Sequence, residues 1–391
     1  MEWKNLIRGF KPSKNKAKSK KELDIYYDIS KIDATNAVYR MIIGQRSNGK
    51  TYKVCRHIVE DYLKESKRGA YVRRYEETLT PKNLHNLFDP HSKLIEDLSE
   101  GRYNHVVYRA KEFHMCYMDK NTGEISDRDP VAFCIGAAIN TAENTKGMDR
   151  GEIHTICFDE FMTRVGYLNN EFVQFMNLLS SLIRDRDDAT IYMLANTVNK
   201  YCPYFKEMGL KNIENLPKGE IALYNYGDSR LTVAVEVCDE VLATKAVASK
   251  YFAFDNPQLR MITNGEWEFQ IYPRPPYKIF KDDIQLTFYI KFAENLLCCE
   301  VIHPTVKSHC NDVFIFVHAQ TKDIELDDNT IVYVQDFSSC RMHVRFLRDV
   351  PTDAHKLIAS LIQRKSVCFS DNEVGEIFRN WLIETQGVKL W

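Results

Sequence analysis

The sequence predicts a mixed α/β fold, with a mostly parallel sheet in the first part of the chain and a strand-rich α+β region at its end. Strand-like and helix-like hydrophobic patterns alternate between residue 38 and about residue 200, which is typical of a parallel sheet covered by helices on both faces. From about residue 266, several strand patterns follow one another with turns between them. A glycine-containing loop separates the first strand from the first helix.

The elements follow from these patterns in order. We expect strands over 36–44, 69–77, 152–161 and 189–198, with helices over 50–66 and 170–184 between them. A final helix is predicted after residue 369, where Ser370 and Glu373 have the spacing of a capping box. The predicted domains are a basic arm (1–24), a first domain (25–228), a linker (229–265) and a C-terminal domain (266–391).

Composition excludes several classes of protein. The 391 residues are 44% hydrophobic and 27% charged, and no window approaches the roughly 18 apolar residues of a membrane span. The N-terminus lacks an apolar signal core. We therefore expect a protein with no membrane partner that stays in the cytosol where it is made.

Charge and cysteine usage give two further expectations. The net charge is -1, which argues against general binding of nucleic acid, but the arm is strongly basic and indicates either a solvated tail or a contact to phosphates. The 11 cysteines are scattered without Cys-x-x-Cys spacing, so a reduced compartment is favoured. Five possible metal ligands are close in sequence: Cys298, Cys299, His303, His309 and Cys310. Because adjacent cysteines suit a zinc site poorly, we interpret the cysteines as packed hydrophobic residues.

The loop after the first strand fits the P-loop pattern Gly-x4-Gly-Lys-Thr, comprising Gly44, Gln45, Arg46, Ser47, Asn48, Gly49, Lys50 and Thr51. Glycines allow backbone N–H groups to close around phosphate oxygens, and the following helix N-terminus adds partial positive charge. Lys50 is expected to reach the β and γ phosphates, and the Thr51 hydroxyl to hold Mg²⁺. The loop therefore predicts a site for ATP and Mg²⁺.

Acidic residues at the end of a later strand complete the pattern. Asp159 follows the apolar run "HTICF" as a Walker B residue does, and Glu160 comes directly after it. Asp159 is expected to bind the metal, and Glu160 to orient an attacking water, which favours hydrolysis. Asn196 ends the strand "IYMLAN", where such ATPases have a polar sensor of the γ-phosphate.

Two arginines end the helix before that last strand. Arg184 and Arg186 could pair with nearby aspartates at the helix end, which is a structural interpretation. They could instead supply an arginine finger to the nucleotide of a neighbouring subunit. The residues alone do not separate the two interpretations.

These motifs together resemble a known family, the DNA packaging ATPases or encapsidation proteins of small phi29-like tailed phages. The segments that carry the resemblance are "VYRMIIGQRSNGKTY", "AYVRRYEE", "TICFDEFMTR", "LLSSLIRDRDDATIYMLANTV" followed by "YCPYF", and "DNEVGEIFRNWLIE". The resemblance implies an additional-strand P-loop ATPase that forms a ring, a homopentamer, on the portal (connector) of an empty procapsid. That ring would drive double-stranded DNA into the procapsid. The protein would be in the host cytoplasm and would occupy the portal vertex only while packaging proceeds.

The resemblance also implies roles for individual arginines. It maps the family's arginine finger onto Arg184 and a P-loop arginine onto Arg46. Arg73 and Arg74, in "VRRY", match the segment that leads into the lid over the nucleotide, and their roles stay open. A structural packaging RNA is a further partner of some relatives and is left open here.

For the C-terminal domain the resemblance implies an RNase H-like fold, as in the large terminases that cut DNA. The candidate metal-binding acids are Asp282, Asp283, Asp327, Asp328 and Asp336. None of them is a single acid within an apolar first strand, where that chemistry needs one. We therefore expect a vestigial nuclease that serves as a docking domain, with a net charge of -4 over 266–391 from 14 basic and 18 acidic residues.

Two alternatives remain from the sequence. One is another DNA-dependent P-loop ATPase, helicase-like or partitioning, that is not tied to a capsid. The other is a docking protein with an inactive nucleotide fold, against which the intact Lys50, Thr51, Asp159 and Glu160 argue.

Overall fold

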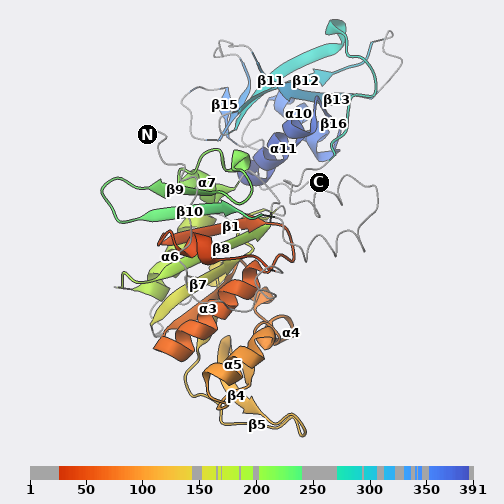
Figure 1. Cartoon of the computed structure of the whole chain (residues 1–391). Helices are drawn as coiled ribbons and strands as arrows, with labels where there is room; N and C mark the ends of the chain where they lie inside the picture. The colour runs from red at the N-terminus through yellow and green to blue at the C-terminus, as the bar shows by residue number, and fades with distance from the viewer. Residues whose placement is uncertain are drawn as a thin grey trace. The chain divides into compact units, whose positions relative to one another are not determined.

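A computed structural model describes most of the chain: residues 26–142, 152–163, 166–168, 170–184, 186–196, 202–239, 271–292, 295–305, 312–321, 330–335, 340, 342–345 and 352–386. The chain divides into two compact units, one of residues 1–164 and 168–268 and the other of residues 165–167 and 269–391 (Figure 1). None of the helices in the described part is long and apolar enough to cross a membrane. Each unit contains one sheet.

The sheet of the first unit is parallel at its centre and antiparallel at its edges. The parallel strands, in spatial order, are β6 (Cys134–Ala138), β2 (Arg68–Arg73), β7 (Ile153–Asp159), β8 (Thr190–Asn196), β1 (Tyr39–Gly44) and β10 (Thr232–Val237). Antiparallel strands extend both edges: β9 (Ile221–Asn225) beside β10, and β4 (Glu112–Met118), β3 (His105–Arg109) and β5 (Ile125–Ser126) on the β6 side. The expected mostly parallel centre is present.

The strand order brings distant parts of the sequence to one edge. β8 lies between β1 and β7, and the register pairs Gly44 with Asn196 and Asp159 with Leu194. Because the carboxyl ends of parallel strands meet at the same edge of a sheet, the residues that follow β1, β7 and β8 lie close together.

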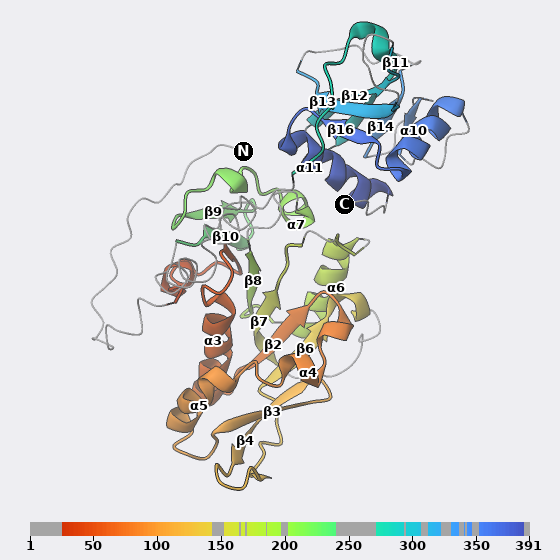
Figure 2. The ribbon, with the colours of Figure 1, turned by 90° about the vertical axis from the view of Figure 1, so that its right-hand side faces the viewer.

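Helices cover both faces of this sheet. α3 (Lys50–Glu65) packs on one face and α6 (Glu171–Ile183) on the other (Figure 2). The buried stripe of α3 includes Val54, Cys55, Ile58 and Val59, with the spacing expected of an amphipathic helix. Shorter helices are α2 (Ser30–Asp33), α4 (Pro81–Leu84), α5 (Ser92–Leu98) and α7 (Pro203–Glu207), with 3₁₀ turns at Glu76–Thr78, Asp89–His91, Ile139–Thr141 and Ile213–Asn215.

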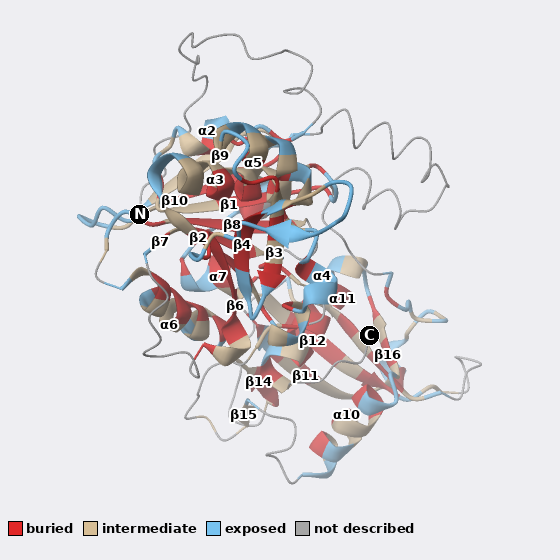
Figure 3. Ribbon diagram, turned by 90° about the horizontal axis from the view of Figure 1, so that it is seen from below, coloured by how far each residue is buried: buried red, intermediate tan, exposed pale blue. Residues whose placement is uncertain are grey.

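The core of the first unit lies between the central strands and these helices. Figure 3 shows the buried class concentrated in the strands, with intermediate residues on the outer sides of the helices. The central β-strand residues Ile42, Val72, Phe158 and Leu194 have no exposed surface. Such burial on both faces explains why these strands appear in the sequence as continuous apolar runs.

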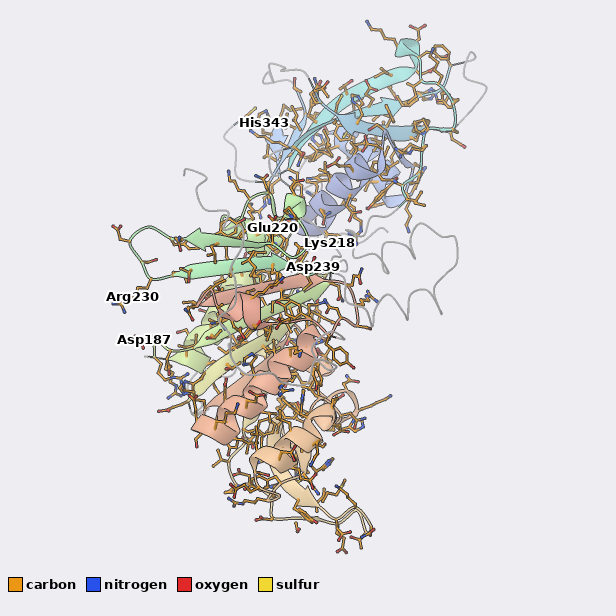
Figure 4. All side chains as sticks on the ribbon, viewed as in Figure 1. Asp187, Lys218, Glu220, Arg230, Asp239 and His343 are labelled. Atoms are coloured by element: carbon orange, nitrogen blue, oxygen red, sulfur yellow. The ribbon has the colours of Figure 1, made fainter. Side chains whose placement is uncertain are left out.

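The predicted end of the first domain at residue 228 is wrong. β10 lies in the predicted linker 229–265, yet it pairs with β1 in the parallel sheet from Tyr39↔Val233 to Ile43↔Val237. Arg230 lies in the turn of the β9–β10 hairpin, at the opposite end of these strands from Lys218, Glu220 and Asp239 (Figure 4). The rest of that predicted linker, from residue 240, lies outside the described residues, as does the basic arm.

The second unit has a sheet of a different kind. β11 (Ile284–Phe292), β12 (Asn295–Ile302) and β13 (Phe314–Ala319) form an antiparallel meander. β14 (Val332–Val334) adds in parallel beside β11, β15 (His343–Val344) beside β14, and β16 (Val367–Phe369) beside β13. A 3₁₀ turn at Lys281–Asp283 precedes β11.

Two helices contribute to the core of the second unit together with its strands. They are α10 (Asp353–Gln363) and α11 (Asn372–Trp381), with a π-helical turn at Leu382–Gln386. Phe378 and Trp381 are fully buried on α11. The predicted capping box is wrong in one detail: Asp371, not Ser370, is the N-cap, and its carboxylate accepts a 2.8 Å hydrogen bond from Val374 N. An acceptor at that position satisfies an N–H group that the helix itself leaves unpaired.

Candidate active site

The predicted P-loop joins β1 to α3 and depends on its two glycines. Gly49 has φ +90°, and a Cβ there would lie 2.9 Å from Cβ of Tyr26. At Gly44 a Cβ would lie 2.8 Å from Cβ of Cys238. Left-handed backbone and close approach each select glycine, so the spacing of the motif is required by the geometry of the loop.

Lys50 opens α3 with its ammonium enclosed by oxygen atoms. Its Nζ donates to Gln45 O (2.7 Å), Asn48 Oδ1 (3.1 Å), Gly44 O (3.3 Å) and Asn196 Oδ1 (3.4 Å). Only 7% of the residue is exposed, and this burial lowers the pKa of Lys50 to about 8. A cation held by neutral oxygens is suited to receive an anionic ligand, since a phosphate would restore the favourable charge pairing lost on burial.

Asp159 ends β7 and faces the start of α3. Its Oδ1 accepts a hydrogen bond from Thr51 Oγ1 at 3.2 Å, and its Oδ2 accepts one from the Tyr71 hydroxyl at 2.7 Å. Burial of Tyr71, followed by the charge of Asp159, raises the pKa of the tyrosine, so it remains a donor. The carboxylate and the hydroxyl that a Walker B residue and a P-loop threonine contribute are therefore adjacent.

Glu160 is held by an arginine from β2. Arg73 Nη2 lies 2.7 Å from Glu160 Oε2, and its Nη1 lies 3.4 Å from Asp159 Oδ2. The Glu160 side chain is 59% exposed, and its backbone has φ +59°, which is rare for a residue with a side chain. Arg73 carries one positive charge, so this pairing compensates one of the two negative charges of Asp159 and Glu160.

Arg74, the next residue, points into a buried network instead. Its Nε donates to Glu171 Oε2 at 2.8 Å, and its guanidinium also donates to Glu160 O (3.2 Å) and Phe161 O (2.6 Å). The Tyr204 hydroxyl donates to Glu171 Oε1 at 2.8 Å. Arg74 and Glu171 are 8% and 0% exposed at their side chains, so this ion pair fastens the backbone after β7 to the first turn of α6.

The P-loop, the end of β7 and the end of β8 surround one pocket with a volume of about 420 Å³. Among the described residues, its lining comprises Arg46, Ser47, Asn48, Gly49, Lys50, Thr51, Tyr52, Asp159, Glu160, Ala195 and Asn196. The structure therefore brings together most of the residues that the sequence selected from three separate segments. Gln45 is buried beneath the loop, and its carbonyl binds Lys50.

Arg184, in contrast, is exposed at the C-terminal end of α6 and does not belong to that lining. Arg186 lies partly buried, where its guanidinium contacts Ile153 O and Ile183 O and lies 3.8 Å from Asp188. Arg186 thus makes contacts at the helix end, and the side chain of Arg184 is exposed. Asp185 lies outside the described residues.

The sequence did not assign Tyr71, Arg73 or Arg74, although a signal was present. Side chains two residues apart in a strand share a face, so Tyr71 and Arg73 had to point the same way, toward the end of β7. Arg74 had to point to the other side. Tyr26 and Tyr52 were also missed; their rings lie 5.3 Å apart beside the loop.

Comparison with known proteins now adds to this geometry. Residues 21–240, more than half of the chain, match the Podovirus DNA encapsidation protein (Gp16) family. The chain belongs to this family. The predicted resemblance to phi29-like encapsidation proteins is confirmed.

Individual members of the family are distant relatives. The DNA packaging protein of Bacillus phage B103 is 29% identical over 176 residues, which cover 44% of this chain and 48% of that protein. The DNA packaging protein of Bacillus phage phi29 is 23% identical over 184 residues, covering 46% and 49%. The chain thus aligns with about half the length of these encapsidation relatives.

A solved structure of the bacteriophage phi29 viral genome packaging motor assembly shares the fold. The match covers 93% of the present chain and 100% of the matched chain of that assembly, with a TM-score of 0.53 and 17% identity. This likeness supports the order of elements described above.

Proposed function

We propose that this encapsidation-family protein hydrolyses ATP to move double-stranded DNA into a preformed procapsid. The observation that carries the proposal is the convergence of Lys50, Thr51, Asp159, Glu160 and Asn196 on one pocket at the carboxyl edge of the parallel sheet. Membership of the encapsidation family supports the coupling of hydrolysis to DNA.

The chain's own residues suggest how hydrolysis proceeds. Backbone N–H groups of the loop and the Lys50 ammonium hold the phosphates, and Asn196 contacts the γ-phosphate end from the neighbouring strand. Thr51 Oγ1 and Asp159 offer adjacent oxygen donors, which is the ligand type that Mg²⁺ prefers. Bound Mg²⁺ would neutralise charge that develops on the phosphates.

Glu160 orients the attacking water in this proposal. Its carboxylate is paired with Arg73 in the structure, so that pair must open before the carboxylate can polarise a water. Because the Glu160 side chain is largely exposed, solvent screens this ion pair and makes it a weak restraint.

Arg184 is proposed to act on the pocket of an adjacent subunit. Its exposed place at the end of α6, outside its own pocket, supports contact with another copy. A homopentameric ring seated on the procapsid portal in the host cytoplasm satisfies this requirement. A structural packaging RNA is compatible with the same arrangement and is not required by any residue described.

The strand orders of the two sheets support an additional-strand P-loop ATPase fold for the first unit and an RNase H-like fold for the second. Insertion of β8 between β1 and β7 is the feature that defines additional-strand P-loop ATPases. In the second unit, a meander extended by parallel strands on the side of its first strand is the arrangement expected of an RNase H-like fold.

That second domain is proposed to dock rather than to cut DNA. β11 has the sequence IQLTFYIKF and contains no acidic residue. Asp283 is 1% exposed, and its carboxylate already accepts hydrogen bonds from Phe280 N, Thr305 N and Thr305 Oγ1. Asp282 is exposed, whereas Asp327, Asp328 and Asp336 lie outside the described residues.

A packaging assay tests the function. Purified protein, procapsids, linear DNA and ATP should yield DNA that resists nuclease digestion, and omission of any component should abolish this protection. Lys50→Ala should protect no DNA, while Lys64→Ala, an exposed change on the same helix, should behave as the unmodified protein. ATPase activity that responds to DNA but never to procapsids would favour the alternative of a helicase-like or partitioning ATPase.

A further inference from the structure

Two neighbouring strands of the second unit place three possible metal ligands on one face of its sheet. Cys298 on β12 lies directly opposite His318 on β13. Glu300 is two residues after Cys298, so its side chain points to the same face of the sheet. Cross-strand partners and residues two apart on one strand are the nearest neighbours that a sheet face offers.

The distances suit a single ion. One ligand atom from each residue, the sulfur, a carboxylate oxygen and an imidazole nitrogen, lies within 4.8 Å of the other two. His318 Nε2 is 3.9 Å from Glu300 Oε2. Zinc bonds of about 2.0–2.3 Å place tetrahedral ligand atoms roughly 3.3–3.8 Å apart, so side-chain adjustments of less than about 1 Å would close the site.

The imidazole is already turned for coordination. His318 Nδ1 lies 3.1 Å from the carbonyl oxygen of Ala319, which can only accept, so this nitrogen carries the proton. The lone pair is therefore on Nε2, the nitrogen that faces Glu300. A ligating histidine is characteristically oriented in this way, by a second hydrogen bond from its other nitrogen to a carbonyl or carboxylate.

The surroundings of the other two ligands also fit. Cys298 is buried and hydrogen-bonded with Tyr289, its partner on β11. Glu300 and His318 keep 19% and 31% of their side chains exposed, so the site is reachable from solvent on one side. Within the described residues, the ion pairs of Glu300 include no lysine or arginine.

We propose that Cys298, Glu300 and His318 form a binding site for a thiolate-accepting divalent metal ion of the Zn²⁺ class, with water in the fourth position. The sulfur, nitrogen and oxygen donors select Zn²⁺ over the hard Mg²⁺ ion, which prefers oxygen ligands alone. The ion joins β12 to β13 and is separate from the Mg²⁺ site of the first unit. This inference does not depend on the proposed motor function.

The sequence analysis considered a different group of possible ligands in this region and interpreted its cysteines as packed hydrophobes. Cys299 faces the opposite side of β12 from Cys298 and is fully buried, as strand alternation requires. His303 lies beyond the end of β12, and His309 and Cys310 lie outside the described residues. Of that set only Cys298 takes part, and its partners are recognisable only from the register.

Cobalt substitution tests the proposal on the full chain. The protein is first treated with a chelator and desalted. Adding one equivalent of Co²⁺ should then produce a sulfur-to-cobalt charge-transfer absorption and the intense visible bands of tetrahedral Co²⁺. Stoichiometric Zn²⁺ should remove these bands, and a thousandfold excess of Mg²⁺ should not. Absence of a thiolate band in folded protein would overturn the proposal.

Matched variants locate the site. Cys298→Ser and His318→Gln should each lose the thiolate band, and Glu300→Gln should weaken Co²⁺ binding by at least about tenfold. Cys368→Ser, a change of a half-buried cysteine on β16 outside the cluster, should keep the band. Circular dichroism must show that each variant is folded; because Glu300→Gln changes a partly exposed side chain, it remains informative if the Cys298 variant unfolds. A band retained in Cys298→Ser, or unweakened binding in Glu300→Gln, would assign the metal to other residues and contradict the proposal.

Discussion

In the first unit, charged side chains gather where parallel strands end, whereas in the second unit the acid before the first strand is enclosed by hydrogen-bond donors. Lys50, Asp159 and Glu160 line an open pocket and pair with groups that a ligand could replace. Asp283, which precedes β11, has both carboxylate oxygens occupied by donors of its own loop and of Thr305.

The difference teaches that an open α/β sheet supports chemistry only where its polar groups remain available. Buried polar groups that are fully hydrogen-bonded stabilise a fold. Groups left at a pocket with long or shared contacts can exchange them for contacts to a ligand. The following experiments test this contrast, beginning with the largest expected effect.

Lys50→Ala should lower ATP hydrolysis by about a thousandfold or more, because the charge that stabilises the transferring phosphate is lost. Steady-state phosphate release measures this effect, with Lys64→Ala as the exposed control on α3. Near-normal turnover in Lys50→Ala would show that the pocket is not the site of hydrolysis.

Arg184→Ala should bind ATP yet hydrolyse it roughly a thousandfold more slowly, as expected for loss of an arginine finger. If Arg184 acts on a neighbouring subunit, mixing this variant with inactive Glu160→Gln should rebuild some intact sites. Partial recovery of ATPase activity is then expected in mixed rings. Co-assembled rings that stay inactive would contradict action between subunits.

Glu160→Gln should slow hydrolysis by about a hundredfold or more while nucleotide binding persists, because the amide retains the shape but not the charge that polarises water. Fluorescent nucleotide titration and single-turnover hydrolysis separate the two properties. Failure to bind nucleotide would instead indicate that Glu160 holds the metal or the fold.

Asp283→Ala should destabilise the second unit by about 3 kcal/mol, because buried donors lose a charged acceptor. Denaturant unfolding followed in that unit measures the change, and Asp282→Ala, at an exposed neighbour, should cost less than about 1 kcal/mol. ATP hydrolysis by the folded Asp283→Ala protein should be unchanged. DNA cleavage that disappears in Asp283→Ala would make this acid catalytic and would break the comparison.

The smallest predicted effect is the contribution of Glu236 to the pH dependence of stability. It compares a buried acid of the first unit with the acids at the pocket. Glu236 accepts a 2.6 Å hydrogen bond from the Tyr27 hydroxyl, and burial raises its pKa to about 7. Because this acid keeps its proton in the folded state up to a higher pH than in the unfolded state, stability should fall as pH rises from about 5 to 8. Between these values the unmodified protein should lose about 2 kcal/mol relative to Glu236→Gln. Parallel pH profiles of the two proteins would contradict the assignment.

The sequence predicted which residues lie together at one pocket better than it predicted the sheet. A strand–loop–helix pattern with Gly-x4-Gly-Lys-Thr, together with acids at a strand end, was sufficient to select Lys50, Thr51 and Asp159, because each lies directly at the end of its own element. β10 was missed because its pairing with β1 joins residues nearly 200 positions apart. No local pattern records such a partner.

The contacts of single polar residues also depend on distant partners that local sequence patterns do not record. Arg73 and Arg74 are adjacent in sequence, but their partners on β7 and α6 decide that one is at the site and the other is buried. The alignment of Cys298 with His318 likewise depends on the register of two strands. Such pairings are set by tertiary packing, which hydrophobic periodicity does not determine.

The buried pair of Arg74 and Glu171 links the loop that carries Glu160 to the helix that ends at Arg184. One guanidinium binds the carbonyl oxygen of Glu160 and the carboxylate at the start of α6, and the other end of that helix carries Arg184. Arg74 therefore connects the backbone of Glu160, through Glu171, to the helix that ends at Arg184. If Arg184 acts between subunits of a ring, as proposed above, this connection would let the state of one nucleotide pocket adjust the arginine offered to the next, and hydrolysis would then proceed in sequence around the ring.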